Sequence, residues 1–215
     1  MNKYFIIFIG LGICLAAYSA RSYFESEHLS LSANENTSRW SIAKPDITKL
    51  KAGDLIFRHG RGFISNALMS LGQREKKYSH SGIISIENGR VLVYHAIGGE
   101  ENISNKLRKD PLSVFCEPAD VHAFGIYRTD LNEKQIDAVM SLVSTYFQRG
   151  LEFDTKFDLA TDDKMYCTEL IYKVFLGALG KQNYISLSTI TGKEYIACDD
   201  LYFNSHCQPI YSYQY

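Results

Sequence analysis

The chain has 215 residues, of which 46% are hydrophobic and 22% are charged, and its formal net charge is -1. This composition is typical of one globular domain and excludes disordered and fibrous chains. The near-neutral charge gives no electrostatic surface for nucleic acid, so we expect no nucleic-acid partner.

The first 20 residues predict a segment that directs the chain out of the cytoplasm. Lys3 precedes an apolar run over residues 4–17, and small residues follow as far as Ala20. This order is typical of a secretory signal peptide, and the run is short for a spanning helix, which needs about 20 residues. A retained membrane anchor over residues 4–20 and a lipoprotein signal at Cys14 are the alternatives. All three predict an extracytoplasmic domain, periplasmic or secreted, and an uncleaved segment would hold it at the membrane.

One domain is expected after this segment. Residues 21–45 are polar and have no periodicity, so they predict a linker. The domain itself is expected over residues 46–215. Within it, the apolar patterns predict strands and helices. The strands are expected at residues 53–58 and 121–128, and the helices at 63–71, 131–148 and 165–179.

The strongest local signal is a β-hairpin. Asn88-Gly89 joins two alternating runs, and an Asn-Gly pair between such runs predicts a two-residue turn. Counting outward from this turn predicts the pairing of the two strands and places Ile84 opposite Val93.

The same count brings two histidines together. His80 and Gly82 share one face with His95, because side chains alternate along a strand. Diagonal neighbours lie roughly 7–8 Å apart at the backbone, within reach of imidazole rings, and Gly82 leaves room between them. One imidazole can then hold the other in the right tautomer for catalysis. The alternative is a pair of hydrogen-bonded residues at the edge of the core.

Cys167 is the candidate nucleophile. It lies near the start of a predicted helix, where Asp162 and Asp163 are expected to supply capping and first-turn acidic groups. The free N–H groups of a helix N-terminus favour the thiolate and can form part of an oxyanion hole. The alternative is a buried cysteine that only packs.

The other cysteines suggest no catalytic role. Cys198 and Cys207 are near enough in sequence to form a disulfide in an oxidising compartment. Cys116 is expected to be a small buried hydrophobe. No pair of cysteines has the spacing of a zinc site, so we expect no metal and no cofactor.

The chain resembles the YiiX/YebB-like family of permuted papain-like enzymes, which are related to the NlpC-type cell-wall peptidases. Four segments carry the resemblance: Gly53-Asp54, Tyr78-Ser79-His80-Ser81-Gly82-Ile83, Phe153-Asp154 and Tyr166-Cys167-Thr168-Glu169-Leu170-Ile171. It covers about residues 50–180. It implies an α+β, circularly permuted papain-like (NlpC-type) fold with an antiparallel sheet packed against helices. The catalytic cysteine would stand at a helix N-terminus, and the histidine strand precedes the cysteine helix, the reverse of the papain order.

The resemblance also implies the site. The family's cysteine nucleophile, histidine base and third polar residue carry over to Cys167, His80 and His95. The third position is often glutamate in close relatives, and histidine is usual in the broader NlpC-type group. Tyr78 and Tyr166 are candidate donors to the oxyanion or the substrate.

The implied activity is hydrolysis of an amide bond through an acyl-enzyme, with cell-wall (peptidoglycan) peptides as the expected substrate. One alternative is a lipid-directed acyl hydrolase or acyltransferase of the lecithin–retinol acyltransferase type, with an N-acyl or lipid substrate. Another is an inactive binding domain. Glu169 and Asp54 are expected to have structural roles.

Overall fold

The computed structural model describes residues 32–99, 102–180 and 184–215. It divides into two compact units, Met1–Ile42 and Ala43–Tyr215. The targeting segment expected over residues 1–20 lies outside the described residues. Among the helices that are described, none combines the length and the apolar character that crossing a membrane requires.

Part of the expected linker is helical. Residues 32–42, in the first unit, form a helix. Two of its hydroxyl groups bond to the preceding turn: Thr37 Oγ1 donates to the carbonyl of Ala33 at 2.8 Å, and Ser41 Oγ donates to that of Thr37 at 3.0 Å. Such local bonds satisfy polar side chains within a helix. The polar sequence without apolar periodicity gave no sign of this helix.

The second unit contains a six-stranded sheet in the order β4-β3-β2-β1-β5-β8, and every neighbouring pair is antiparallel. Its strands are β1 (Leu55–Gly60), β2 (His80–Glu87), β3 (Arg90–His95), β4 (Arg108–Pro111), β5 (Val121–Thr129) and β8 (Cys207–Gln214). A separate ribbon joins β6 (Ser188–Ile190) to β7 (Lys193–Tyr195).

The hairpin has the predicted register. Ile84 pairs with Val93 across β2 and β3, and Asn88 and Gly89 both have the positive φ that a tight turn of this kind requires. The neighbouring strand β4 pairs with β3 and was not expected. Its sequence, Arg-Lys-Asp-Pro, has no apolar alternation.

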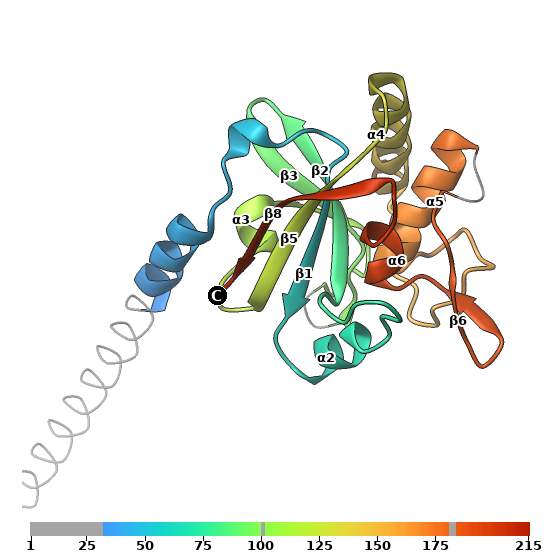
Figure 1. Ribbon diagram of the computed structural model, residues 1–215, viewed down its shortest axis with the longest axis horizontal. Helices are drawn as coiled ribbons and strands as arrows, with labels where there is room; N and C mark the ends of the chain where they lie inside the picture. The colour runs from blue at the N-terminus through green and yellow to red at the C-terminus, as the bar shows by residue number, and fades with distance from the viewer. Residues whose placement is uncertain (1–31, 100–101, 181–183) are drawn as a thin grey trace, which may run out of the picture. The chain divides into compact units, whose positions relative to one another are not determined.

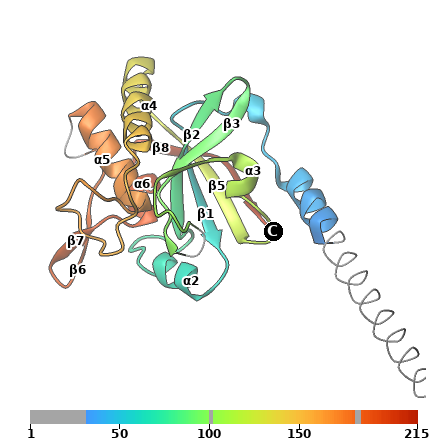
Figure 2. The same ribbon diagram turned by 180° about the vertical axis from the view of Figure 1, so that it is seen from behind.

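The helices lie on two sides of the sheet. They are α2 (Phe63–Met69), α3 (Leu112–Phe115), α4 (Glu133–Gln148), α5 (Cys167–Leu179) and α6 (Cys198–Tyr202), with a 3-10 turn at Ile47–Lys49. Side chains of α4 and α5 form the main core with one face of the sheet, including Ile83 and Tyr94. Figures 1 and 2 show α4 and α5 on this side and α3 on the other.

The helix α5, which carries the candidate nucleophile, begins later than expected. Cys167 is its first residue, and Tyr166 is the N-cap. The capping group is Glu169, whose Oε2 accepts the Tyr166 N–H at 3.1 Å. Asp162 instead pairs with Lys173 at 2.6 Å. The expectation that Asp162 and Asp163 cap the helix is therefore corrected.

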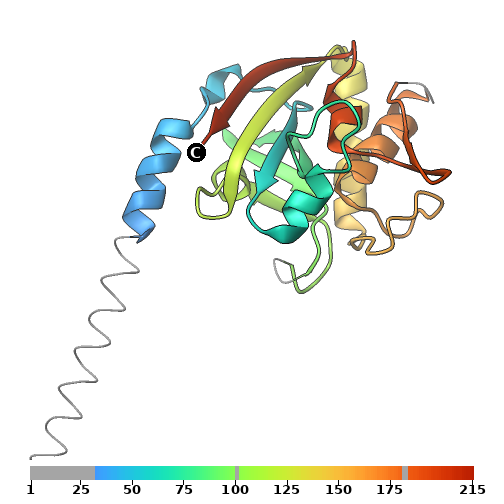
Figure 3. The same ribbon diagram turned by 60° about the horizontal axis from the view of Figure 1, so that its bottom comes forward.

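The C-terminal residues complete the sheet. β8 pairs with β5 as an edge strand, as Figure 3 shows, and α6 precedes it. Cys198 and Cys207, which were considered as a disulfide, are both free thiols. Cys116 is a free, fully buried thiol, as expected.

Candidate active site

Cys167 lies at the N-terminus of α5, where two hydrogen bonds join the helix to Ile196. Thr168 Oγ1 donates to the carbonyl of Ile196 at 2.7 Å, and the Ile196 N–H donates to the Tyr166 hydroxyl at 3.0 Å. These two bonds tie the first turn of α5 to the segment that leads into α6. Cys167 is 8% exposed, so the residue is buried but keeps a small contact with solvent.

Burial dominates the electrostatics of this thiol. It raises the pKa of Cys167, although the N–H and hydroxyl of Ser81 and the N–H groups at the start of α5 act in the opposite direction. The net shift is upward. The N–H groups at the start of α5 thus favour the thiolate as expected, but loss of solvation outweighs them.

The two histidines meet as expected. His80 Nε2 and His95 Nδ1 are 2.9 Å apart, and the rings meet edge to face with centroids 5.1 Å apart. Phe115 of α3 stacks on His80 and meets His95 edge-on. A side chain in place of Gly82 would collide with Val93, so the glycine is required at this close approach.

The hydrogen bonds of the histidine pair extend to two further residues, which the sequence analysis did not predict as part of the site. His95 Nε2 lies 3.0 Å from Asp110 Oδ2, and the same oxygen accepts from Arg108 at 2.7 Å. Both residues belong to β4 and pair with β3 beside His95. The sequence of β4, three charged residues and a proline, does not predict a strand. Only the order of the strands in the sheet places Asp110 beside His95.

Both imidazoles are neutral near pH 7. Burial and the nearby Arg58, His95 and Arg108 lower the pKa of His80 well below 6.5. Burial also lowers the pKa of His95, although the hydrogen bond to Asp110 opposes this.

The nucleophile and the histidines approach the sheet from different sides. Ile83 and Tyr94 point into the core with α5, so strand alternation directs His80 and His95 to the face that carries α3. Cys167 reaches β2 at Ser81, the neighbour of His80. Within the described part of the chain, no hydrogen bond joins Cys167 to either imidazole. Their catalytic pairing stays a prediction.

The two candidate tyrosine donors have other contacts. The Tyr166 hydroxyl accepts from the Ile196 N–H, and the Tyr78 hydroxyl lies against Gly125 of β5. Tyr78 also packs among the rings of Phe57, Tyr127 and Tyr202. Their role at the oxyanion stays a prediction.

Glu169 and Asp54, for which structural roles were expected, each form hydrogen bonds and ion pairs that stabilise the fold. Glu169 is fully buried, caps α5 and lies 3.1 Å from Lys173. Burial raises its pKa to about 7. Asp54 accepts from the Lys51 N–H at 2.8 Å and pairs with Arg128 at 2.7 Å, beside the start of β1.

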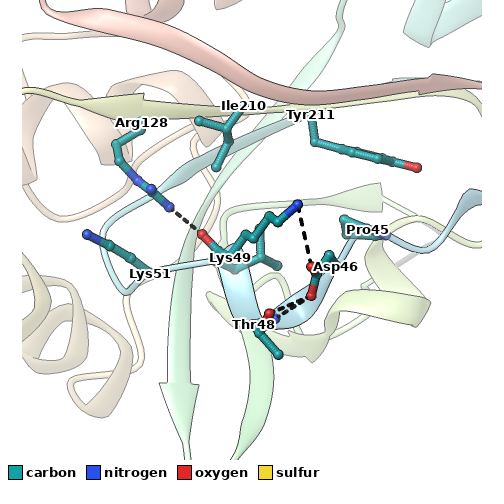
Figure 4. A pocket seen from close by; sticks show the side chains of 9 residues that line it. Pro45, Asp46, Thr48, Lys49, Lys51, Arg128, Ile210 and Tyr211 are labelled. Atoms are coloured by element: carbon teal, nitrogen blue, oxygen red, sulfur yellow. Dashed lines mark hydrogen bonds and ion pairs between the residues drawn. The ribbon is translucent and has the colours of Figure 1, made fainter.

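A separate surface pocket of about 540 Å³ lies near this Asp54 pair. It is lined by Pro45, Asp46, Thr48, Lys49, Leu50, Lys51, Arg128, Ile210 and Tyr211, most of which Figure 4 labels. The lining has no thiol and no imidazole. The histidines are near the other end of β1, where Arg58 pairs with His80. This pocket is therefore not the candidate active site.

Three comparisons with known proteins concern the family and the fold. Residues 49–195 match the family described as "Permuted papain-like amidase enzyme, YaeF/YiiX, C92 family". The uncharacterized protein YiiX of Escherichia coli (strain K12) is 25% identical over 132 residues, which are 60% of this chain and 59% of YiiX. The alignment thus spans less than two thirds of that relative.

The fold is also that of a solved structure. The metalloprotein yiiX of Escherichia coli O157:H7 (DUF1105) aligns with a TM-score of 0.63 and 18% identity, over 76% of this chain and 98% of that one. In this chain, the described residues include no group of three or more His, Cys, Asp or Glu side chains that could hold a metal ion. His95 illustrates why, since both of its ring nitrogens are engaged by His80 and Asp110. The residues present do not fit a metal at the histidine pair.

The family match covers more than half of the chain, and the expected α+β fold with its antiparallel sheet is confirmed. The chain belongs to the permuted papain-like amidases of the YaeF/YiiX, C92 family, a family of cysteine amidases.

Proposed function

We propose that the protein hydrolyses an amide bond in cell-wall peptides, with Cys167 as nucleophile, His80 as base and His95 as the residue that orients the base. The observation that carries this proposal is the buried His80–His95 pair at 2.9 Å, next to the point where Cys167 at the start of α5 reaches β2. Membership of an amidase family supports the amide bond.

The steps follow from these positions. Nδ1 of His80 takes the thiol proton when substrate brings it within hydrogen-bond distance of Cys167, a contact that often tightens only in the complex. The thiolate then adds to the amide carbonyl, and the backbone N–H of Cys167, which starts the helix, stabilises the oxyanion. The C–N bond breaks as the imidazolium returns its proton to the leaving amine. Water then hydrolyses the thioester and releases the acid and the free thiol.

A second substrate class is favoured by the orientation of α2. Ser65 faces the domain, with its Oγ 2.5 Å from Ser79 Oγ, and the exposed Asn66 contacts His59 Nε2 at 2.9 Å. Two apolar side chains at the start of the helix face solvent, with Phe63 86% and Ile64 74% exposed. Because Ser79 precedes the proposed base, an apolar surface lies close to the site. That arrangement favours an N-acyl or lipid substrate.

One experiment tests both substrate classes. The full-length protein is incubated with peptidoglycan stem peptides and, separately, with vesicles that contain N-acyl lipids, and the released amine is measured. We expect release from the stem peptides, its loss in Cys167→Ala, and its retention in Cys207→Ala, which removes another free thiol. Cysteine-dependent release from the vesicles alone would assign the lipid class. Release that persists in Cys167→Ala would contradict the mechanism.

A further inference from the structure

A continuous hydrogen-bonded chain crosses three neighbouring strands. It runs from His80 on β2 to His95 on β3 and on to Asp110 on β4, with separations of 2.9 Å and 3.0 Å. Arg108 closes the outer end at 2.7 Å from Asp110. The two histidines are 8% and 2% exposed, so water is largely excluded from the chain.

The donor and acceptor chemistry of these groups allows one proton arrangement. Burial opposes ionisation of Asp110, but the hydrogen bonds from His95 and Arg108 lower its pKa, so it is a carboxylate and only accepts. His95 must then carry its proton on Nε2, which leaves Nδ1 as an acceptor. His80 must therefore donate from Nε2, and its lone pair stands on Nδ1.

We propose that Asp110 is a positioning residue that sets the tautomers of His95 and His80 in turn, and so presents Nδ1 of His80 as the catalytic base. The inference rests on the proposed function, because it assumes that His80 is the base. The protein would then use a four-residue arrangement of Cys167, His80, His95 and Asp110. The acid stands one residue further from the nucleophile than in relatives that have glutamate in place of His95.

The surrounding packing holds this arrangement in place. Phe115 stacks on His80 at an interplanar angle of 26° and meets His95 at 89°. Phe115 is itself held by Arg58 of β1. The Arg58 guanidinium lies over the Phe115 ring, 5.0 Å from its centroid, and donates to the Phe115 carbonyl at 3.1 Å. A ring flip of His95 would break both hydrogen bonds, and a flip of His80 would break the bond between the two rings. With the ring orientations held in this way, the tautomers depend on the acceptor that Asp110 supplies.

Asp110→Leu removes the acceptor at the end of the chain. The oxygen of Asp110 that accepts from His95 also accepts from Arg108, so only a donor is left beside His95 Nε2, and the His95 proton moves to Nδ1. His95 then donates to His80 Nε2, and the His80 proton moves to Nδ1. The substitution changes the size of the side chain little but removes the lone pair from the position that the base requires.

Nitrogen NMR of the full-length protein, labelled with ¹⁵N in histidine, reads these protons directly. In the wild-type protein we expect both His80 and His95 to carry the proton on Nε2 alone. In Asp110→Leu we expect both to carry it on Nδ1. Asp130→Leu is the matched control, because Asp130 contacts His206 at 2.9 Å in a partly exposed pair and that variant should leave His80 and His95 unchanged.

Turnover separates this inference from the proposed function. With the tautomers reversed, we expect kcat to fall on the order of 100-fold with KM nearly unchanged. Reversed tautomers support the positioning role even if turnover is unaffected, and in that case it is the role of His80 as base that fails. A wild-type spectrum with the proton on Nδ1 of either ring would overturn the inference, and so would unchanged tautomers in a folded Asp110→Leu variant. The wild-type spectrum decides the matter even if the variant does not fold.

Discussion

On the α3 face of the sheet the buried polar side chains bond to one another across three strands, whereas on the α5 face the buried ionisable groups of the first helical turn have only local partners in the described part of the chain. His80, His95 and Asp110 form a chain from β2 to β4. Glu169 instead bonds to Tyr166 and Lys173 of its own segment, and Cys167 reaches Ser81 of β2. Among the residues that the structure describes, the α3 face thus carries an extended polar network, and the α5 face does not.

This difference determines the resting protonation state. On the α3 face, burial and the arginines lower the pKa of His80, and on the α5 face, burial raises that of Cys167. Both shifts favour the uncharged form. The resting enzyme therefore holds a neutral imidazole and a neutral thiol, not a thiolate–imidazolium pair. In the proposed mechanism, His80 then acts by general base catalysis at the moment of attack.

Removing the base from the α3 face should have the largest effect. Turnover in His80→Gln should fall on the order of 1,000-fold, because the variant lacks the Nδ1 lone pair that takes the thiol proton in the proposed mechanism. His122→Gln is the control. His122 is a partly exposed histidine near His59 and Arg61, and its loss should change turnover little. Equal losses in the two variants would show that His80 contributes only to folding.

The α5 face can be tested by the pH dependence of thiol reactivity. The rate at which iodoacetamide alkylates Cys167 should rise about tenfold per pH unit from pH 6 to pH 8, since the thiolate fraction grows in this way below the pKa. Mass spectrometry of the Cys167 peptide gives the rate, and Cys207, whose pKa burial raises to about 12, provides a slower internal reference. A rate that is already constant below pH 6 would reveal an ion pair and contradict the neutral resting state.

Local signals in the sequence predicted the α3 face well up to its edge. The Asn88-Gly89 turn fixed the hairpin register, and alternation then placed His80 and His95 together. Asp110 was missed because β4 is short and charged, and its place beside β3 depends on the sheet order. That order is a long-range property that no local pattern contains.

The α5 face was harder to predict for a different reason. β2 is apolar on both faces, with Ile83 on one and Ile84 on the other, so the sequence did not reveal which face α5 covers. The start of α5 was also misplaced. Asp162 and Asp163 resemble capping residues, but the cap is Glu169 from within the helix. Nothing in the local sequence distinguishes a helix capped by an acidic residue before it from a helix capped by an acidic residue in its first turn.

The smallest expected effect concerns the buried carboxyl group of the α5 face. Glu169 has a pKa of about 7 in the folded protein against an ordinary value of 4.5, so the folded chain holds this proton more tightly than the unfolded chain. Its contribution to stability is therefore greatest below about pH 4.5 and is lost as the pH rises to 7, by on the order of 2 kcal/mol. Glu169→Gln keeps an acceptor for the Tyr166 N–H and cannot ionise, so the loss should disappear.

Urea unfolding at pH 5, 6, 7 and 8 measures this effect. Relative to the wild type, Glu169→Gln should gain about 2 kcal/mol between pH 5 and pH 8, after the constant cost of losing the contact with Lys173 is subtracted. Glu152→Gln is the control, because Glu152 pairs with Lys164 at the surface and its pKa is lowered, which places its effect below this pH range. Parallel curves for the wild type and Glu169→Gln would mean that Glu169 stays ionised. The α5 face would then stabilise a buried charge as fully as the α3 face does.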